Sequence, residues 1–180
     1  LKFLVIQRSQ VTKNLEHIPF VSEILRFALN DMKYLYIHSM IKGTFPIDKF
    51  RELETPFYYY DAKVLRDTLD VIRKEAGKYE NYHVHYAVKA NANPKVLSII
   101  RESGLGADCV SGGEVRAAIK AGFPSNKIVY AGVGKTDKEI NYSLDHDIFC
   151  FNVESVPELE VINELAEAKG KVAQVAFRIN

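Results

Sequence analysis

The strongest constraint on the fold is a regular alternation of strand-like and helix-like segments after residue 55. Strand-like runs follow one another at intervals of 22, 22, 20 and 24 residues, beginning near Val84, Gly106, Ile128, Ile148 and Val172. A helical pattern fills each gap, at residues 94–103, 112–121, 137–145 and 156–169. Strands that are separated by such helices run parallel. The rhythm therefore predicts an α/β protein with about five βα units.

Local signals support the expected helix boundaries. Three helices begin with a serine or threonine that is followed three residues later by glutamate, a pattern that predicts a capping box. The pairs are Ser111 with Glu114, Thr136 with Glu139, and Ser155 with Glu158. Glycine, which left-handed helix ends favour, occupies three of the expected helix ends. These glycines are Gly104, Gly122 and Gly170.

A strand and a helix are predicted before the repeating units. The strand is the aromatic run at residues 55–60, and the helix covers residues 61–76, with Asp61 as its cap and Gly77 at its end. Further upstream, residues 19–33 have the pattern of an amphipathic helix, with Pro19 suited to its first turn.

The first 39 residues differ from the rest of the chain. They carry five basic and three acidic side chains, a charge of +2, which leaves −1 for the other residues. Nothing in this segment suggests chemistry. We expect Met40 to be the natural start, with residues 1–39 as an upstream extension that can be helical.

Both a doubly wound sheet and a barrel contain repeated βα units, and strand alternation favours the barrel. Strands that are buried in an open sheet are usually apolar on both faces. Here one face is apolar and the other is small or polar in three strands. Val84, Tyr86 and Val88 oppose His83, His85, Ala87 and Lys89; Phe149, Phe151 and Val153 oppose Cys150, Asn152 and Glu154; Val175, Phe177 and Ile179 oppose Gln174, Ala176 and Arg178. We therefore predict a partial (β/α)8 TIM-type barrel.

Composition narrows the classes of function. The formal net charge of +1 gives no electrostatic reason to expect a nucleic acid or an anionic membrane as partner. No apolar run reaches the roughly 18 residues that a transmembrane helix requires. Cys109 and Cys150 form neither a disulfide framework nor a metal-binding pattern, so we expect a cytoplasmic protein without a metal site.

Lys89 is the first candidate for chemistry. It ends the run at residues 84–89, on the face that would line the barrel interior. Barrel enzymes build their active sites at the carboxyl ends of the strands. A lysine amine at that end can form an imine with an aldehyde cofactor. Spacing alone leaves a second interpretation open, namely an ordinary surface lysine at the end of a strand.

The segment Tyr86-Ala87-Val88-Lys89-Ala90-Asn91 resembles the cofactor-lysine motif of the fold-type III pyridoxal-phosphate decarboxylases, which have an alanine-racemase-like barrel. Four further segments follow the family's order and, together with the lysine motif, most resemble its diaminopimelate branch. They are Thr55-Pro56-Phe57-Tyr58, Gly106-Ala107-Asp108-Cys109-Val110-Ser111-Gly112-Gly113-Glu114, Phe151-Asn152-Val153-Glu154-Ser155 and Phe177-Arg178-Ile179-Asn180. The resemblance covers residues 40–180, the front portion of a pyridoxal-phosphate-binding barrel.

The resemblance implies a role for each matching residue. Lys89 would hold pyridoxal phosphate as a Schiff base, and Ala87 would be a small residue close to its ring. Asp108 would be an acid near the Schiff base, and Arg178 would reach toward the ring. Asp108 as a hydrogen-bonded strand residue and Arg178 as an interior ion-pair partner remain open. For the other residues of the matching segments, Ser111 and Glu114, helix capping is the favoured explanation.

The implied reaction is the decarboxylation of meso-2,6-diaminopimelate to L-lysine and CO2, by a full-length homodimer. The phosphate loops, the ring partners and a second β domain would follow Asn180. We therefore expect the 180-residue chain alone to be inactive. Alternatives are a decarboxylase of ornithine, arginine or carboxynorspermidine, a non-enzymatic pyridoxal-phosphate carrier, and a scaffold domain without a cofactor.

Three other signals are set aside. The loop from Ala131 to Thr136 contains Gly134-Lys135-Thr136, but Val129 occupies the position where a Walker loop needs its first glycine. His83 and His85 lack further zinc ligands nearby. The tyrosines at residues 58–60 have no accompanying basic stripe for base stacking.

Overall fold

The structure, a computed structural model, describes residues 45–179. Residues 73–179 form one compact unit, and residues 45–72 belong to another. The predicted helix at residues 19–33 and the boundary expected at Met40 lie outside the described residues. None of the helices in residues 45–179 combines the length and the apolar character needed to cross a bilayer.

The described part of the smaller unit is organised by aromatic contacts. It contains the short helix α4 (Ile47–Phe50) and the start of α5 (Ala62–Ala76). The ring of Phe50 lies 5.3 Å from that of Phe57 and 5.0 Å from that of Tyr59. The strand predicted at residues 55–60 is wrong. This segment pairs with no strand among the described residues, and two of its aromatic rings pack on Phe50 instead.

The helix predicted at residues 61–76 is confirmed as α5. Its cap is Asp61, whose Oδ1 accepts hydrogen bonds from the backbone N–H groups of Lys63 at 2.9 Å and Val64 at 3.1 Å. These bonds satisfy N–H groups that have no partner inside the first turn of a helix.

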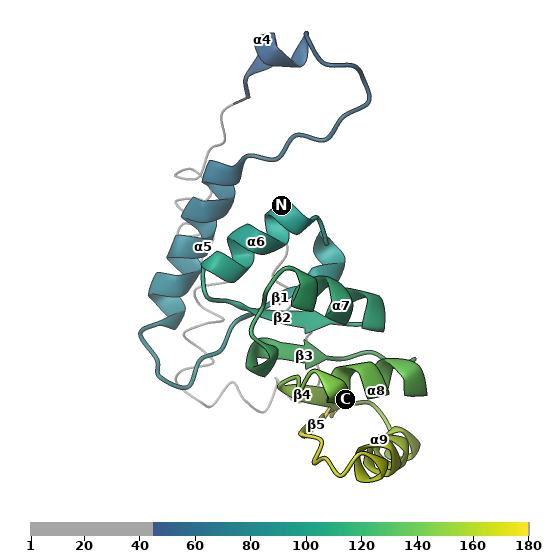
Figure 1. The fold of residues 1–180 in the computed structure, drawn as a ribbon. Coiled ribbons are helices and arrows are strands. Elements are labelled where there is room, and N and C mark those ends of the chain that lie inside the picture. Colours follow the sequence, from purple (N-terminus) through teal and green to yellow (C-terminus); the bar gives the residue numbers. More distant parts are fainter. Residues whose placement is uncertain (1–44, 180) are drawn as a thin grey trace. The chain divides into compact units, whose positions relative to one another are not determined.

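The larger unit contains a five-stranded parallel sheet (Figure 1). Its strands are β1 (His85–Ala87), β2 (Gly106–Cys109), β3 (Ile128–Tyr130), β4 (Cys150–Val153) and β5 (Val175–Phe177). Their spatial order is their chain order, and each neighbouring pair is parallel. A doubly wound sheet would reverse its strand order at a switch point. The sequential order is that of a barrel, so the predicted partial (β/α)8 barrel is confirmed.

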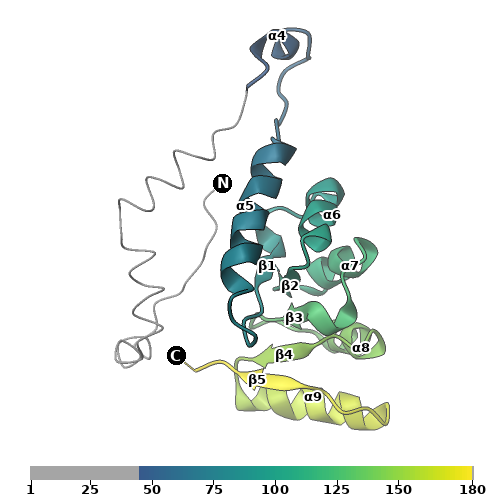
Figure 2. The same cartoon turned by 90° about the vertical axis from the view of Figure 1, so that its left-hand side faces the viewer.

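Helices connect the strands at the predicted positions. They are α6 (Pro94–Glu102), α7 (Gly112–Lys120), α8 (Asp137–Asp145) and α9 (Val156–Ala168). Gly104, Gly122 and Gly170 have the expected positive φ angles of 86°, 83° and 62° just after α6, α7 and α9. Figure 2 shows α6, α7 and α8 on one side of strands β1 to β4. A barrel keeps its helices on one face of the sheet in this way.

The two faces of the sheet differ in burial. The side chains toward the helices are apolar and almost completely buried, namely Val88, Ala107, Cys109, Ile128, Tyr130, Phe151 and Val153. On the opposite face Ala87 and Asp108 are half-buried, and Val129 and Cys150 are just buried. The predicted division into a helix-packed face and an interior face is confirmed for the central strands.

Two details of the predicted alternation are wrong. Phe149 precedes β4 and stacks on His85, with ring centroids 6.5 Å apart, instead of joining Phe151 on the helix-packed face. His85 can reach across the sheet because Gly106 has no Cβ at the place that the imidazole occupies. The apolar face of β5 is exposed, since Val175 and Phe177, on the edge strand of the sheet, are 36% and 63% exposed.

Candidate active site at the carboxyl ends of the strands

Lys89 lies in the 3-10 turn η2 (Val88–Ala90), directly after β1. Val88 is completely buried and anchors the turn, whereas Lys89 is exposed. Asn91 closes the turn, because its N–H donates to the carbonyl of Val88 at 3.1 Å and its own carbonyl accepts from the Tyr86 hydroxyl at 3.2 Å. The amine is thus carried by a fixed backbone at the carboxyl end of the strand.

Asp108 lies beside Ala87 in the sheet, in the register of β1 and β2. Its Oδ1 is buried and accepts no hydrogen bond from the residues that the structure describes. Burial raises the pKa of Asp108, and the nearby His85 and Lys89 oppose that rise. A buried carboxylate oxygen without a donor is costly. Its position therefore suits a ligand or side chain that brings a proton or a positive charge.

The remaining residues of this face are small or weakly polar. Register places Ala87, Asp108, Val129 and Cys150 in one row across four strands. The Cys150 thiol lies 3.7 Å from Oδ1 of Asn152, and burial raises its pKa. Burial also raises the pKa of Cys109, on the opposite face, so both thiols stay protonated and neither is a ready nucleophile.

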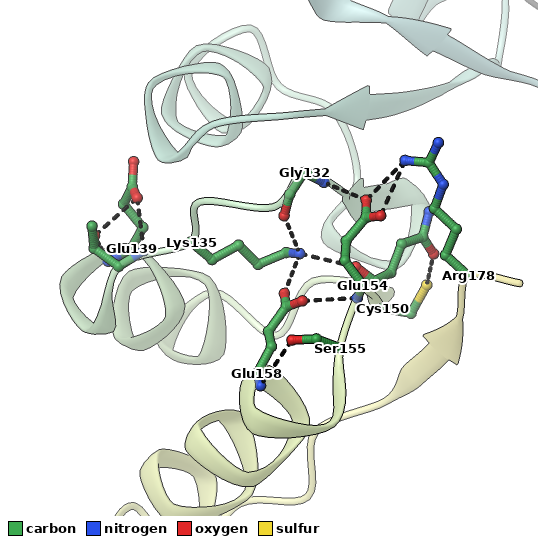
Figure 3. A network of polar contacts seen from close by, with 10 residues as sticks. Gly132, Lys135, Glu139, Cys150, Glu154, Ser155, Glu158 and Arg178 are labelled. Atoms are coloured by element: carbon green, nitrogen blue, oxygen red, sulfur yellow. Dashed lines mark hydrogen bonds and ion pairs between the residues drawn. The ribbon is translucent and has the colours of Figure 1, made fainter. Parts of the chain in front are cut away.

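Lys135, which the sequence placed only in a rejected Walker-like loop, is buried and organises the neighbouring segments (Figure 3). Nζ of Lys135 donates to the carbonyls of Gly132 at 2.8 Å and Asn152 at 2.9 Å, and it pairs with the Glu158 carboxylate. The side chain of Lys135 is 1% exposed and that of Glu158 is 12% exposed. This ammonium joins the loop after β3 to strand β4 and to the first turn of α9, and all three of its protons have acceptors. It does not point to a phosphate.

Arg178 follows β5 and pairs with Glu154, the residue that follows β4. Its Nη1 lies 3.1 Å from both oxygens of the Glu154 carboxylate. Oε1 of Glu154 also accepts from the N–H of Gly132 at 3.2 Å. The structure therefore places Arg178 in an ion pair, and it brings together the loops that follow β3 and β4 and the end of β5.

The three predicted capping boxes differ in outcome. Thr136 and Glu139 form a complete box at the start of α8. The serines also cap their helices, but the carboxylates of Glu114 and Glu158 accept from the residue before the cap, at Val110 and Glu154, both at a distance of 2.8–2.9 Å. The prediction of a strict capping box is wrong for α7 and α9. In both, the backbone turns so that the N–H of the residue before the N-cap, and not that of the N-cap itself, donates to the glutamate.

Glu139 links helices α7 and α8, in addition to its part in the capping box of α8. Its Oε1 accepts from the N–H of Gly112 at 2.9 Å, and the absence of a Cβ on Gly112 makes room for the carboxylate. Hydrogen bonds from Thr136 are the main cause that lowers the pKa of Glu139. The carboxylate is therefore ionised at neutral pH and ties the start of α7 to the start of α8.

The histidines do not form a metal centre in the described part of the chain. His83 is exposed, and His85 is half-buried against Phe149. Burial is the main cause that lowers the pKa of His85, so its imidazole is neutral at physiological pH. Residues 45–179 contain no group of three histidine, cysteine or acidic side chains arranged to hold a metal ion.

Comparisons with known proteins point to one family. The family model for "Pyridoxal-dependent decarboxylase, pyridoxal binding domain" matches residues 65–180. The diaminopimelate decarboxylase of Bacteroides thetaiotaomicron is 76% identical over 140 residues, which cover 78% of this chain and 36% of that protein. The Aquifex aeolicus diaminopimelate decarboxylase is 47% identical over 126 residues, which cover 70% of this chain and 29% of that protein. The chain thus spans about a third of the length of these relatives.

Solved structures agree with the sequence comparison. The diaminopimelate decarboxylase of Helicobacter pylori, solved with L-lysine, matches 74% of this chain and 34% of its own, with a TM-score of 0.69 and 41% identity. The enzyme from M. jannaschii matches 75% of this chain and 32% of its own, with a TM-score of 0.72 and 37% identity. A viral arginine decarboxylase at 23% identity shares the fold, with a TM-score of 0.57.

Proposed function

Because the chain belongs to the pyridoxal-dependent decarboxylase family, we propose that the native protein converts meso-2,6-diaminopimelate to L-lysine and CO2. The high identity to diaminopimelate decarboxylases supports the choice of substrate. The structural observation that carries the proposal is the position of Lys89, directly after β1 and near Asp108, a carboxylate whose Oδ1 is buried and lacks a donor in the described residues.

The residues present fit pyridoxal phosphate. Lys89 supplies an exposed amine to attach the cofactor aldehyde, and Ala87, beside Asp108, leaves space for a flat ring. Asp108 supplies the acceptor that a proton on the lysine nitrogen requires. Arg178 supplies a cation at the same end of the sheet. When bound, the cofactor takes up the electron pair that remains as the carboxylate departs.

The chain's own residues then have defined tasks. Lys89 would hold the cofactor through its amine and would release it when the amine of the substrate takes its place. Asp108 stabilises positive charge on that nitrogen through its ionised carboxylate. The bond between the α-carbon and its carboxylate breaks, CO2 leaves, and a proton takes its place to give the product amine. The fixed turn after β1 keeps the nitrogen at the edge where barrel enzymes bind substrates.

The test uses the native protein at its full length with Lys89→Ala, and with Lys120→Ala as a control for an exposed lysine at the end of α7. Borohydride reduction followed by peptide mass spectrometry should locate the cofactor on Lys89. Lys89→Ala should lose the visible absorbance of the lysine-bound cofactor and at least about a thousandfold in kcat, since covalent and electrostatic steps both depend on this group. Lys120→Ala should keep both.

A label on another lysine, or visible absorbance that survives Lys89→Ala, would overturn this proposal. Assays with diaminopimelate, ornithine, arginine and carboxynorspermidine, each followed by release of CO2, identify the substrate. Turnover of ornithine or arginine in preference to diaminopimelate would replace the substrate and keep the cofactor. A protein that binds the cofactor and decarboxylates none of them would be a carrier.

We infer further that the protein works in the cytoplasm as a homodimer. Cys109 and Cys150 are buried and form no disulfide, which suits a reducing compartment. The resemblance to the decarboxylase family supports the dimer. Sedimentation of the purified protein at two concentrations tests it, and a monomer at micromolar concentration would contradict it.

A further inference from the structure

The most informative contact outside the lysine site is the one between Glu154 and Arg178. The arginine follows an edge strand, and its N–H donates to the carbonyl of Val153 at 2.9 Å. Its side chain is 40% exposed, so packing restrains it little. A long arginine side chain without such restraint samples many rotamers. The contacts from Nη1 to both oxygens of Glu154, each 3.1 Å, hold its guanidinium toward that carboxylate.

Glu154 is fixed much more firmly than the arginine that it binds. Its side chain is 9% exposed, and Oε1 accepts from the N–H of Gly132. Its own N–H donates to Oε2 of Glu158 at 2.8 Å. Both ends of the residue are therefore attached to neighbouring loops (Figure 3).

The same network continues to Lys135. Its ammonium binds two groups, the carbonyl of Gly132 and the carboxylate of Glu158. The N–H of Gly132 donates to the Glu154 carboxylate, and the Glu158 carboxylate accepts from the N–H of Glu154. A buried and fully bonded cation thus fixes both groups that fix Glu154. Networks of this kind hold a side chain in one orientation when every member has a partner.

We propose that Glu154 is a positioning residue that aims the Arg178 guanidinium at the carboxyl edge of the sheet. This role rests on the proposed function, because it assigns Arg178 to the edge where the cofactor binds. Glu154 touches neither substrate nor cofactor in this scheme. It acts through Arg178 by restricting its rotamers and by balancing its charge.

The experiment is a double-mutant cycle in the native full-length protein. The single variants are Glu154→Gln, which removes the charge and keeps the shape, and Arg178→Gln; the cycle is completed by the double variant. Asp145→Asn is the matched control, because Asp145 pairs with Lys169 at 2.7 Å in an exposed contact at the other end of the sheet. The readouts are the cofactor dissociation constant, kcat, and the visible circular dichroism of the bound cofactor, which depends on its orientation.

Glu154→Gln should weaken cofactor binding or lower kcat about tenfold, as loss of a supporting partner does at other sites, and change the visible circular dichroism. In the Arg178→Gln background the same substitution should have little further effect, because the group on which it acts is gone. Asp145→Asn should leave all three readouts unchanged.

Full additivity of the two substitutions, or unchanged readouts in Glu154→Gln, would overturn the proposal. If Glu154→Gln does not fold, Arg178→Lys tests the pair from the other side. It keeps the charge, but an ammonium that binds Glu154 has no second nitrogen to direct at the edge of the sheet, so it should reproduce the dichroism change, and an unchanged spectrum would overturn the proposal. A wild-type protein without lysine-bound cofactor would instead contradict the proposed function.

Discussion

Lysines connect neighbouring βα units at both ends of the sheet, but their surroundings differ. At the amino ends of the strands, Lys169 pairs with Asp145 at 2.7 Å and Lys171 with Asp147 at 2.8 Å. These lysines are 28% and 32% exposed, and their carboxylates 53% and 79%. At the carboxyl ends, Lys135 is 1% exposed and has two carbonyls and a carboxylate as acceptors.

The difference shows at which end of the sheet the side chains must be held in one defined arrangement. Exposed pairs contribute little to stability, because water and salt weaken them. A buried pair costs desolvation energy and offers mainly a defined geometry when every group is bonded. Barrel enzymes keep their active sites at the carboxyl ends and use the amino ends for stability. The buried Lys135 network lies at the end that must be held in one arrangement.

Removal of the buried lysine is the strongest challenge to this comparison. Lys135→Met should lower the free energy of unfolding by about 3–5 kcal/mol, since the buried Glu158 carboxylate would lose its counter-charge and keep only the N–H of Glu154, and two carbonyls would lose the ammonium as donor. Urea unfolding of the cofactor-free full-length protein, followed by far-ultraviolet circular dichroism, measures the loss. The double variant Lys135→Met with Glu158→Gln should recover part of it, because no unpaired charge remains. A double variant less stable than Lys135→Met would contradict this explanation.

Asp108→Asn removes a second charge at the carboxyl ends of the strands. We expect this substitution to raise the stability of the folded protein, whereas Lys135→Met lowers it. Burial keeps the folded pKa of Asp108 above its unfolded value, so the folded protein loses stability as pH rises from the unfolded pKa through the folded one. The asparagine has no charge to bury. The cofactor-free variant should therefore melt at a higher temperature than the wild type at pH 7.5.

The gain should shrink as the pH falls toward 4, where the wild-type carboxylate becomes protonated. We expect it to be much smaller than the loss in Lys135→Met, because Asp108 is only half-buried and the nearby charge of Lys89 offsets part of the penalty. Melting curves at the two pH values measure the effect. A gain that is equal at both, or a loss at pH 7.5, would show that burial of the charge is not the cause.

The sequence predicted the elements whose causes are local. Helices α6 to α9 begin at residues with capping side chains, and three of them end near glycines with positive φ. Alternation placed Val88 and Phe151 on the helix-packed face. Residues 55–60 have the composition of a strand, but a strand also needs a neighbouring strand to pair with, and the sequence of one segment does not show whether it has one.

Much of the candidate site depends on distant contacts. Lys135 resembles any loop lysine until the loop after β3, strand β4 and the start of α9 bring two carbonyls and the Glu158 carboxylate around it. The pattern at Ser155 and Glu158 predicted a cap, but not that the carboxylate also binds a lysine 23 residues earlier in the chain. The lack of a donor to Oδ1 of Asp108 among residues 45–179 is likewise a tertiary property, since the sequence specifies the carboxylate and not its surroundings.

The smallest expected change in stability comes from the exposed ion pairs at the amino ends of the strands. Lys169→Met removes the ion pair with Asp145 and leaves a solvated carboxylate, so the free energy of unfolding should fall by less than about 1 kcal/mol. High salt should reduce even this difference. The loss of unfolding free energy in Lys135→Met should persist at high salt, because Lys135 and Glu158 are buried away from the solvent ions. Parallel urea titrations in low and high salt test both statements. Equal losses in the two variants would mean that burial does not distinguish the two ends of the sheet.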